Sequence, residues 1–349
     1  MRKQVQALLL LLLVLTLTAC GETIVSPQAG SASEQDAGVE EISNENAAVE
    51  DDADQNKEDS ILNIEIEEIP HEYKEAADHP GEVIRFDYDT DMESKYAYIY
   101  LPYGYDGDRQ YDILYMMHGG GGSQESLFGG AGQNNDIKNV IDHLVENGEM
   151  EPILIVTPTF YTQEHGSTSV SGSWDAVIEF PDELTSFLMP AVESAYSTYA
   201  ETADEAGFKQ SREHRAFGGF SMGSVTTWYV FEQQLDNFSK FIPISGDSWT
   251  EGMQAGRSNP DATAKALSDS VTNQGYGAED FRIYAITGSE DIAEPCMTPM
   301  FESLADHSDI FRMYENANTY YYVKDGGVHD MPYVKEYLYN LLPMIYGGN

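Results

Sequence analysis

The sequence is poor in cysteine and in basic residues for its length. Two cysteines, Cys20 and Cys296, occur in 349 residues, too few for a disulfide framework or a thiolate-rich zinc site. The 18 Lys and Arg residues stand against 60 Asp and Glu residues, and the formal net charge is −42. Such a chain repels phosphate backbones and anionic lipid surfaces, which argues against a nucleic-acid partner.

The apolar run at the N-terminus, Ala7–Leu17, is too short for a membrane span. It has about eleven residues where roughly 20 are needed, and Arg2 and Lys3 precede it, as in an export signal. The small residues before Cys20 resemble the lipobox of bacterial lipoproteins. We therefore expect residues 1–20 to be a signal peptide and Cys20 to be lipidated, which would anchor the protein at the cell surface outside the cytoplasm. The alternative is an ordinary cleaved signal in which Cys20 is incidental.

Residues 21–70 have a different composition from the rest of the chain. They carry fifteen acidic residues, one basic residue and no aromatic residue. Such a segment buries too little apolar surface to offset its chain entropy. We expect an acidic, solvated tether that holds a folded domain, residues 71–349, away from the membrane.

Short apolar strands and amphipathic helices alternate through most of residues 71–349. The first strands predict a short antiparallel meander, and the spacing of Leu184, Leu188, Val192 and Tyr196 predicts a helix bent by Pro190. The later alternation predicts an α/β fold whose mostly parallel central sheet has helices on both faces. The predicted strands are Val83–Tyr88, Tyr96–Leu101, Ile113–Met117, Ile153–Thr157, Ala216–Phe220, Phe241–Ser245, Phe281–Thr287 and Tyr320–Val323, and a helix near Pro332–Leu342 closes the chain.

The strongest chemical signal is Gly-Phe-Ser-Met-Gly at residues 219–223, between a predicted strand and a predicted helix. Glycines on both sides permit a sharp turn in which a strained serine projects its hydroxyl. The pentapeptide alone is weak evidence, but this context predicts that Ser221 is a nucleophile. The alternative is a glycine-rich turn without chemistry.

A serine hydroxyl needs a base, and the base needs a group that fixes its tautomer. His329 follows a late strand in a glycine-rich loop, which favours it as the base. Glu290 and Asp291 lie in the loop that follows the predicted strand Phe281–Thr287. For the group that fixes the tautomer we favour Asp291, the shorter acid. A carboxylate that merely caps the next turn remains the alternative. The order Ser221, Asp291, His329 is that of α/β-hydrolases.

The negative oxygen that forms on an attacked carbonyl also needs hydrogen-bond donors. Met222, next after the serine, should supply one backbone N–H. His118 and four glycines follow the strand that ends at Met117, and Gly120 or Gly121 should supply the other N–H. The side chain of His118 should be architectural. A glycine loop without a role is the alternative.

Taken together, segments 118–122, 215–223, 245–249, 288–291 and 326–330 resemble esterase D-like α/β-hydrolases. They are similar in particular to the feruloyl and acetyl-xylan esterases of carbohydrate esterase family 1. The resemblance implies a serine esterase that uses no cofactor or metal and removes feruloyl or acetyl groups from xylan-type plant polysaccharides. Ser224, where many relatives have another glycine, departs from the pattern and affects helix packing rather than chemistry.

Three further residues are candidates for substrate binding. Trp249 and Trp174 could form an aromatic platform for a phenolic acyl group or a sugar ring, and Asp247 could accept a hydrogen bond from substrate. Core packing for the tryptophans and turn capping for Asp247 are the alternatives. The resemblance leaves open an acyltransferase, a siderophore or S-formylglutathione esterase, and a non-catalytic glycan-binding lipoprotein.

Overall fold

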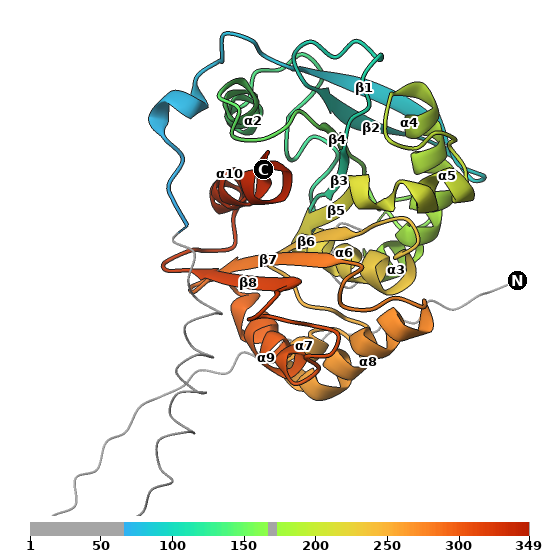
Figure 1. The fold of residues 1–349 in the computed structure, drawn as a ribbon, viewed down its shortest axis with the longest axis vertical. Coiled ribbons are helices and arrows are strands. Elements are labelled where there is room, and N and C mark those ends of the chain that lie inside the picture. The colour runs from blue at the N-terminus through green and yellow to red at the C-terminus, as the bar shows by residue number, and fades with distance from the viewer. Residues whose placement is uncertain (1–65, 167–172, 349) are drawn as a thin grey trace, which may run out of the picture. The chain divides into compact units, whose positions relative to one another are not determined.

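Eight strands form one sheet in the order β1-β2-β4-β3-β5-β6-β7-β8 (Figure 1). The computed structural model of the chain describes residues 66–166 and 173–348. The pairs β1·β2 and β2·β4 are antiparallel and the other pairs are parallel, so the predicted mostly parallel sheet is confirmed. The strands are β1 (Glu82–Asp89), β2 (Ser94–Leu101), β3 (Ile113–Met117), β4 (Leu154–Thr157), β5 (Arg215–Phe220), β6 (Lys240–Ile244), β7 (Arg282–Gly288) and β8 (Thr319–Lys324).

The prediction of an opening antiparallel meander is correct for β1 and β2 and wrong for β3. A tight turn at residues 90–93 joins β1 to β2, so these two strands pair as a hairpin. β3 instead pairs in parallel with β4 and β5, and β4 lies between β2 and β3. The longer connection through residues 102–112 removes the constraint that a tight turn imposes, and parallel pairing then places β3 near the middle of the sheet.

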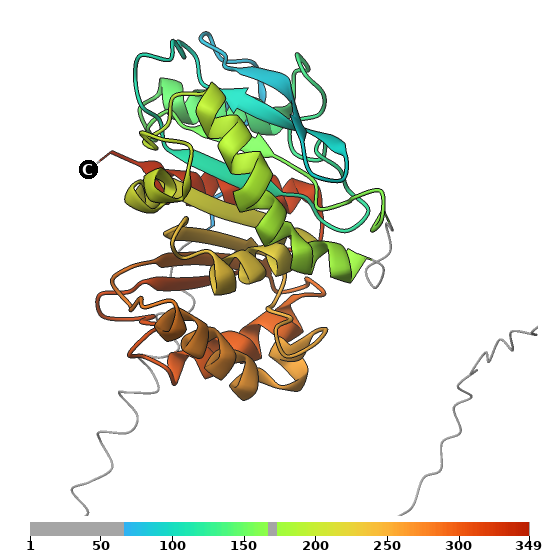
Figure 2. The ribbon, with the colours of Figure 1, turned by 90° about the vertical axis from the view of Figure 1, so that its right-hand side faces the viewer.

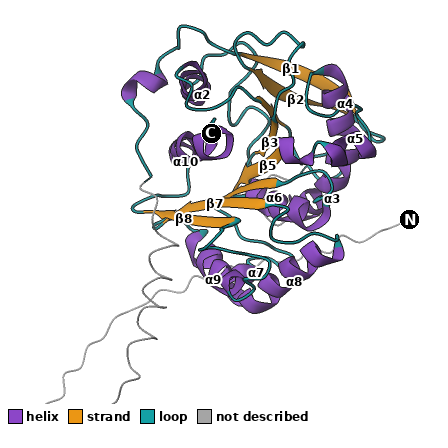
Figure 3. Ribbon diagram, in the orientation of Figure 1, coloured by secondary structure: helices purple, strands orange, loops and turns teal. Residues whose placement is uncertain are grey.

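Helices cover both faces of the sheet, as Figure 3 shows with strands between two helical layers. The helices α2 (Asp136–Glu146) and α10 (Met331–Tyr346) pack on one face. Figure 2 looks onto the opposite layer, which also includes the short helix α5 (Glu205–Gln210). Its longer helices are α3 (Trp174–Glu183), α4 (Met189–Ala195), α6 (Met222–Gln233), α8 (Pro260–Asn273) and α9 (Glu294–Ala305).

The side chains of β3 explain why the strand is apolar throughout. Ile113, Tyr115 and Met117 belong to the core cluster under α3 and α6, whereas Leu114 and Met116 belong to the cluster under α2 and α10. Because successive strand residues point to opposite faces, a sheet covered on both sides needs an apolar residue at every position. Full burial of each such side chain contributes about 1.5–3 kcal/mol.

The predicted helix around Leu184–Tyr196 is longer and less regular than its spacing indicated. It continues α3 through a π-helical turn, Leu184–Leu188, into α4. Pro190 lies in the first turn of α4 and has no N–H to give to the preceding turn. The wider π turn accommodates that missing donor, so the irregularity lies just before the proline.

At the start of the described chain, residues 66 and 67 already contact the domain. The Lys324 ammonium donates to the Ile66 carbonyl, and the Glu67 backbone exchanges hydrogen bonds with the Asn340 amide. Contacts with the domain therefore begin before residue 71. The predicted signal peptide, Cys20 and residues 21–65 of the predicted tether lie outside the described residues. Within 66–166 and 173–348, no helix is long and apolar enough to cross a membrane.

Candidate active site

Ser221 lies at a strained turn between the end of β5 and the start of α6. Its φ of 56° and ψ of −115° are unusual for a residue with a side chain. Its N–H donates to the Ile244 carbonyl on the neighbouring strand, which fixes the turn. A Cβ on Gly219 would lie 2.4 Å from the Gly223 carbonyl, and one on Gly223 would lie 2.4 Å from the Met117 oxygen. Both flanking positions therefore require glycine.

The structure brings Ser221, His329 and Asp291 into one hydrogen-bonded chain. The Nε2 atom of His329 lies 2.9 Å from Ser221 Oγ, and its Nδ1 atom lies 2.7 Å from Asp291 Oδ1. Asp291 also accepts the Ala293 N–H at 2.8 Å. Burial by itself would raise the pKa of Asp291, but the hydrogen bonds from His329 and Ala293 outweigh it, and the net pKa lies below 3.8. A carboxylate in this position holds Nδ1 protonated and leaves Nε2 free to accept the serine proton.

Of the two candidate triad acids, Glu290 and Asp291, it is Asp291 that contacts His329. Its side chain has no exposed surface. The Glu290 side chain is exposed, and its backbone N–H donates to the Gly327 carbonyl. The loop after β7 therefore points the second of its two acids into the site.

The glycine loop after β3 lies against the nucleophile. A Cβ on Gly119 would be 3.2 Å from Ser221 Cβ. The Gly121 N–H donates to the Tyr161 hydroxyl at 2.8 Å, whereas the Gly120 N–H has no partner among the described residues. Met222 is the first residue of α6, where backbone N–H groups have no partner within the helix. The geometry favours Gly120 over Gly121 as the donor that would accompany Met222.

The three candidate substrate-binding residues differ in how exposed their side chains are and in whether their polar atoms already have partners. Both Asp247 oxygens are occupied, since Oδ1 accepts from Trp249 Nε1 and Oδ2 accepts from the Gly256 N–H. Asp247 is 4% exposed, so its role is internal and the prediction of a substrate contact is not supported. Trp249 is buried as well and meets Trp174 edge to face at 5.9 Å. Trp174, which donates to the Tyr229 hydroxyl, is partly exposed and remains the candidate for a platform.

Sequence reasoning missed two residues that hold the glycine loop, Thr159 and Tyr161, in the segment after β4. Thr159 Oγ1 lies 2.7 Å from His118 Nε2, and the Tyr161 hydroxyl accepts the Gly121 N–H. His118 Nδ1 lies 2.7 Å from the Gly119 carbonyl, which can only accept, so Nδ1 carries the proton and Nε2 accepts from Thr159. The side chain of His118 is architectural, as expected. No spacing in the sequence marks Thr159 or Tyr161, because their role depends on the fold.

Protonation of His118 should cost stability. Burial lowers its pKa from 6.5 to about 4. The folded state thus binds fewer protons than the unfolded state at His118, and its stability falls as the pH drops from about 6.5 towards 4, by roughly 2–3 kcal/mol. Urea unfolding at pH 7 and pH 4.5 should show that the wild type loses this much more stability than His118→Gln. Equal losses in the two proteins would contradict the assignment.

Cys296 is buried, and burial raises the pKa of its thiol to about 11, so it stays protonated and is a poor nucleophile. In the part of the chain that the structure describes, no group of three or more His, Cys, Asp or Glu side chains is placed to hold a metal ion.

The sequence of this chain is similar to those of known proteins. The Esterase family model matches residues 91–344. The chain is 35% identical over 287 residues to endo-1,4-beta-xylanase Y of Acetivibrio thermocellus, and the match covers 81% of this chain. It covers 25% of that relative, so the chain spans about a quarter of the relative's length.

Two solved structures are similar to this fold. A serine-to-alanine mutant of the feruloyl esterase module from Clostridium thermocellum, complexed with sinapinate, superposes with a TM-score of 0.71 at 34% identity. That match covers 81% of this chain and 94% of the module. A ferulic acid esterase from Anaeromyces mucronatus in complex with ferulic acid gives a TM-score of 0.60 at 19% identity, over 82% of this chain and 98% of that one. At that identity the second likeness shows the α/β-hydrolase fold alone.

Proposed function

Since the chain belongs to the Esterase family, we propose that it hydrolyses carboxylic esters through an acyl-enzyme on Ser221. The observation that carries the proposal is the hydrogen-bonded chain from Ser221 Oγ through His329 to Asp291, at 2.9 and 2.7 Å. The glycine loop that lies beside Ser221 and the first turn of α6 would supply the backbone N–H donors. A serine, an oriented base and backbone donors together are the parts that acyl transfer needs.

The mechanism runs in two acyl-transfer steps. Ser221 Oγ attacks the ester carbonyl while His329 Nε2 takes its proton, and Asp291 stabilises the imidazolium. The Met222 and Gly120 N–H groups bind the oxyanion of the tetrahedral intermediate. His329 then gives its proton to the leaving alkoxide, and the acyl-enzyme forms. Water attacks the acyl-enzyme by the same route and releases the acid.

The proposed substrates are feruloyl or acetyl esters on xylan-type plant polysaccharides. Support comes from two relatives at about one third identity, one named as a xylanase and the other as a feruloyl esterase module complexed with sinapinate. The partly exposed Trp174, edge to face with Trp249, provides aromatic surface of the kind that phenolic rings contact. No described residue dictates acyl transfer to an acceptor other than water.

The location of the enzyme is a proposal from sequence. The short apolar run before Cys20 and the acidic segment after it support a lipid-anchored enzyme outside the cytoplasm, tethered at the cell surface. Membrane fractionation of cells that express the full chain should find it with the membranes. The Cys20→Ser variant should be released, and its retention would contradict the anchor.

A single substrate panel tests the proposed function. Purified enzyme is given methyl ferulate, acetylated xylan and p-nitrophenyl acetate, and the released acid is measured. We expect turnover of at least one natural ester class together with p-nitrophenyl acetate. Absence of turnover on all three would overturn the proposal in favour of a glycan-binding protein. An acyl group diverted to added alcohol in place of water would indicate a transferase.

A further inference from the structure

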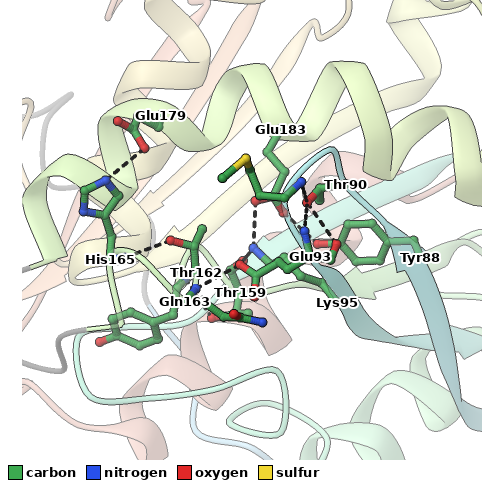
Figure 4. A network of polar contacts seen from close by, with 12 residues as sticks. Tyr88, Thr90, Glu93, Lys95, Thr159, Thr162, Gln163, His165, Glu179 and Glu183 are labelled. Atoms are coloured by element: carbon green, nitrogen blue, oxygen red, sulfur yellow. Dashed lines mark hydrogen bonds and ion pairs between the residues drawn. The ribbon is translucent and has the colours of Figure 1, made fainter.

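A buried ion pair outside the triad connects to the glycine loop. Lys95, near the start of β2, lies 2.7 Å from a carboxylate oxygen of Glu183 at the end of α3, with side chains 4% and 13% exposed (Figure 4). The other Glu183 oxygen accepts the Tyr88 hydroxyl at 2.7 Å. Removing two charges from water is costly, and a buried pair is often no more stabilising than apolar residues of the same size. A contribution to stability therefore does not by itself explain why Lys95 and Glu183 are buried together.

The ammonium of Lys95 also has a second partner, which connects the ion pair to the segment after β4. It donates to the Thr159 carbonyl at 2.9 Å, in the segment that follows β4 (Figure 4). Thr159 in turn holds His118 through its hydroxyl, and that hydroxyl also accepts the Tyr161 N–H at 3.2 Å. The ion pair therefore anchors the short segment that carries both Thr159 and Tyr161.

That segment holds the glycine loop on both sides of Gly120. On one side, Thr159 fixes His118, whose ring also donates to the Gly119 carbonyl. On the other side, the Tyr161 hydroxyl takes the Gly121 N–H. The peptide between these two attachments carries the N–H proposed for the oxyanion. Its position relative to Ser221 thus depends on where residues 159–161 sit.

We propose that Lys95, paired with Glu183, is a positioning residue for the oxyanion hole, acting through Thr159 and Tyr161 on the Gly120 N–H. The inference rests on the proposed ester hydrolysis and extends it to residues that touch no substrate. A donor must lie about 2.7–3.1 Å from the position of the developing oxyanion. A displacement of about 1 Å at such a site lowers the rate roughly a hundredfold. The buried Lys95–Glu183 pair fixes the Thr159 carbonyl and so limits movement of the segment that holds the glycine loop.

The test removes both charges together, so that no unpaired charge is left buried. Lys95→Met/Glu183→Gln keeps the size of each side chain. We expect kcat on p-nitrophenyl acetate to fall about 10- to 100-fold while KM stays within about twofold, because the lost interaction acts in the transition state. The affinity for phenylboronic acid, which forms a tetrahedral adduct on Ser221, should fall by the same factor. Affinity for the product acid should not change.

A matched control is the exposed pair Lys265–Asp269 on α8, at 2.5 Å. The variant Lys265→Met/Asp269→Asn should leave kcat, KM and boronate affinity unchanged. If the Lys95 double variant fails to fold, Thr159→Val and Thr159→Ser replace it. The valine variant, without the hydroxyl that holds His118, should show the same loss of kcat, and the serine variant should retain wild-type kcat.

One readout does not depend on turnover. Amide hydrogen exchange in residues 118–123 should be faster in the double variant than in the wild type, because the loop loses its anchor. Wild-type exchange there, or a folded double variant with wild-type kcat, would overturn the inference. If the double variant showed a higher KM and a lower affinity for the product acid together with the lower kcat, the inference would also be overturned. Such a result would mean that the whole substrate-binding site had been disrupted. An inactive wild type with faster exchange in the variant would instead contradict the proposed function.

Discussion

Replacing Ser221 with alanine is expected to lower kcat on p-nitrophenyl acetate about a million-fold, the typical loss when a triad nucleophile is removed. The hydroxyl at 2.9 Å from His329 Nε2 provides the oxygen that would form the acyl-enzyme, and alanine has no atom to take its place. Backbone donors at Met222 and Gly120 would remain and leave some residual catalysis, roughly a thousand-fold or more over water. Steady-state kinetics with p-nitrophenyl acetate, corrected for its spontaneous hydrolysis, measures the loss.

The same substitution should not unfold the protein. The Ser221 N–H bond to the Ile244 carbonyl is made by the backbone and persists in alanine. A matched control is Ser258→Ala, which removes an exposed hydroxyl bonded to the Gln254 carbonyl and should leave kcat unchanged. Residual activity above about 1% of wild type in Ser221→Ala, in a sample free of wild-type enzyme, would contradict a nucleophilic role for Ser221.

The catalytic residues of the site were more predictable from sequence than the residues that hold the glycine loop in place. Ser221, Asp291 and His329 each follow a predicted strand, and strands of a parallel sheet end at the same edge, so local patterns place the three residues together. The choice between Glu290 and Asp291 depends on which side chain the turn buries, and the chain order alone did not decide it. Asp247 and Trp249 follow a strand in the same way, yet the loop after β6 turns both inward.

The order of strands and the network around Lys95 could not be obtained in the same way. The residue pattern identified β3 and β4 as strands, but the position of β4 between β2 and β3 follows from pairing between segments far apart in the chain. Lys95 and Glu183 are 88 residues apart, and Thr159 and His118 are 41 residues apart. Each contact is made by common residue types with no local signature. Contacts of this kind appear only when the fold brings the segments together.

Replacing Asp291 with asparagine is expected to lower kcat about ten-thousand-fold with KM nearly unchanged, as expected for a triad acid. The asparagine amide can donate to His329 Nδ1, which favours the tautomer with the proton on Nε2. That proton faces Ser221 Oγ, where the base must be free to accept. Asparagine keeps the size and shape of the aspartate side chain. The loss of kcat would therefore come from the changed tautomer of His329 and not from changed packing.

The neighbouring acid provides the matched control for this prediction. Glu290→Gln removes one charge from the same loop, but its side chain is exposed, so kcat should stay within about twofold of wild type. The pKa of Asp291 below 3.8 means that its carboxylate stays ionised from pH 5 upward, so the Asp291→Asn defect should persist across that range. A defect of equal size in Glu290→Gln, or a defect in Asp291→Asn that disappears above pH 5, would contradict the assignment of Asp291.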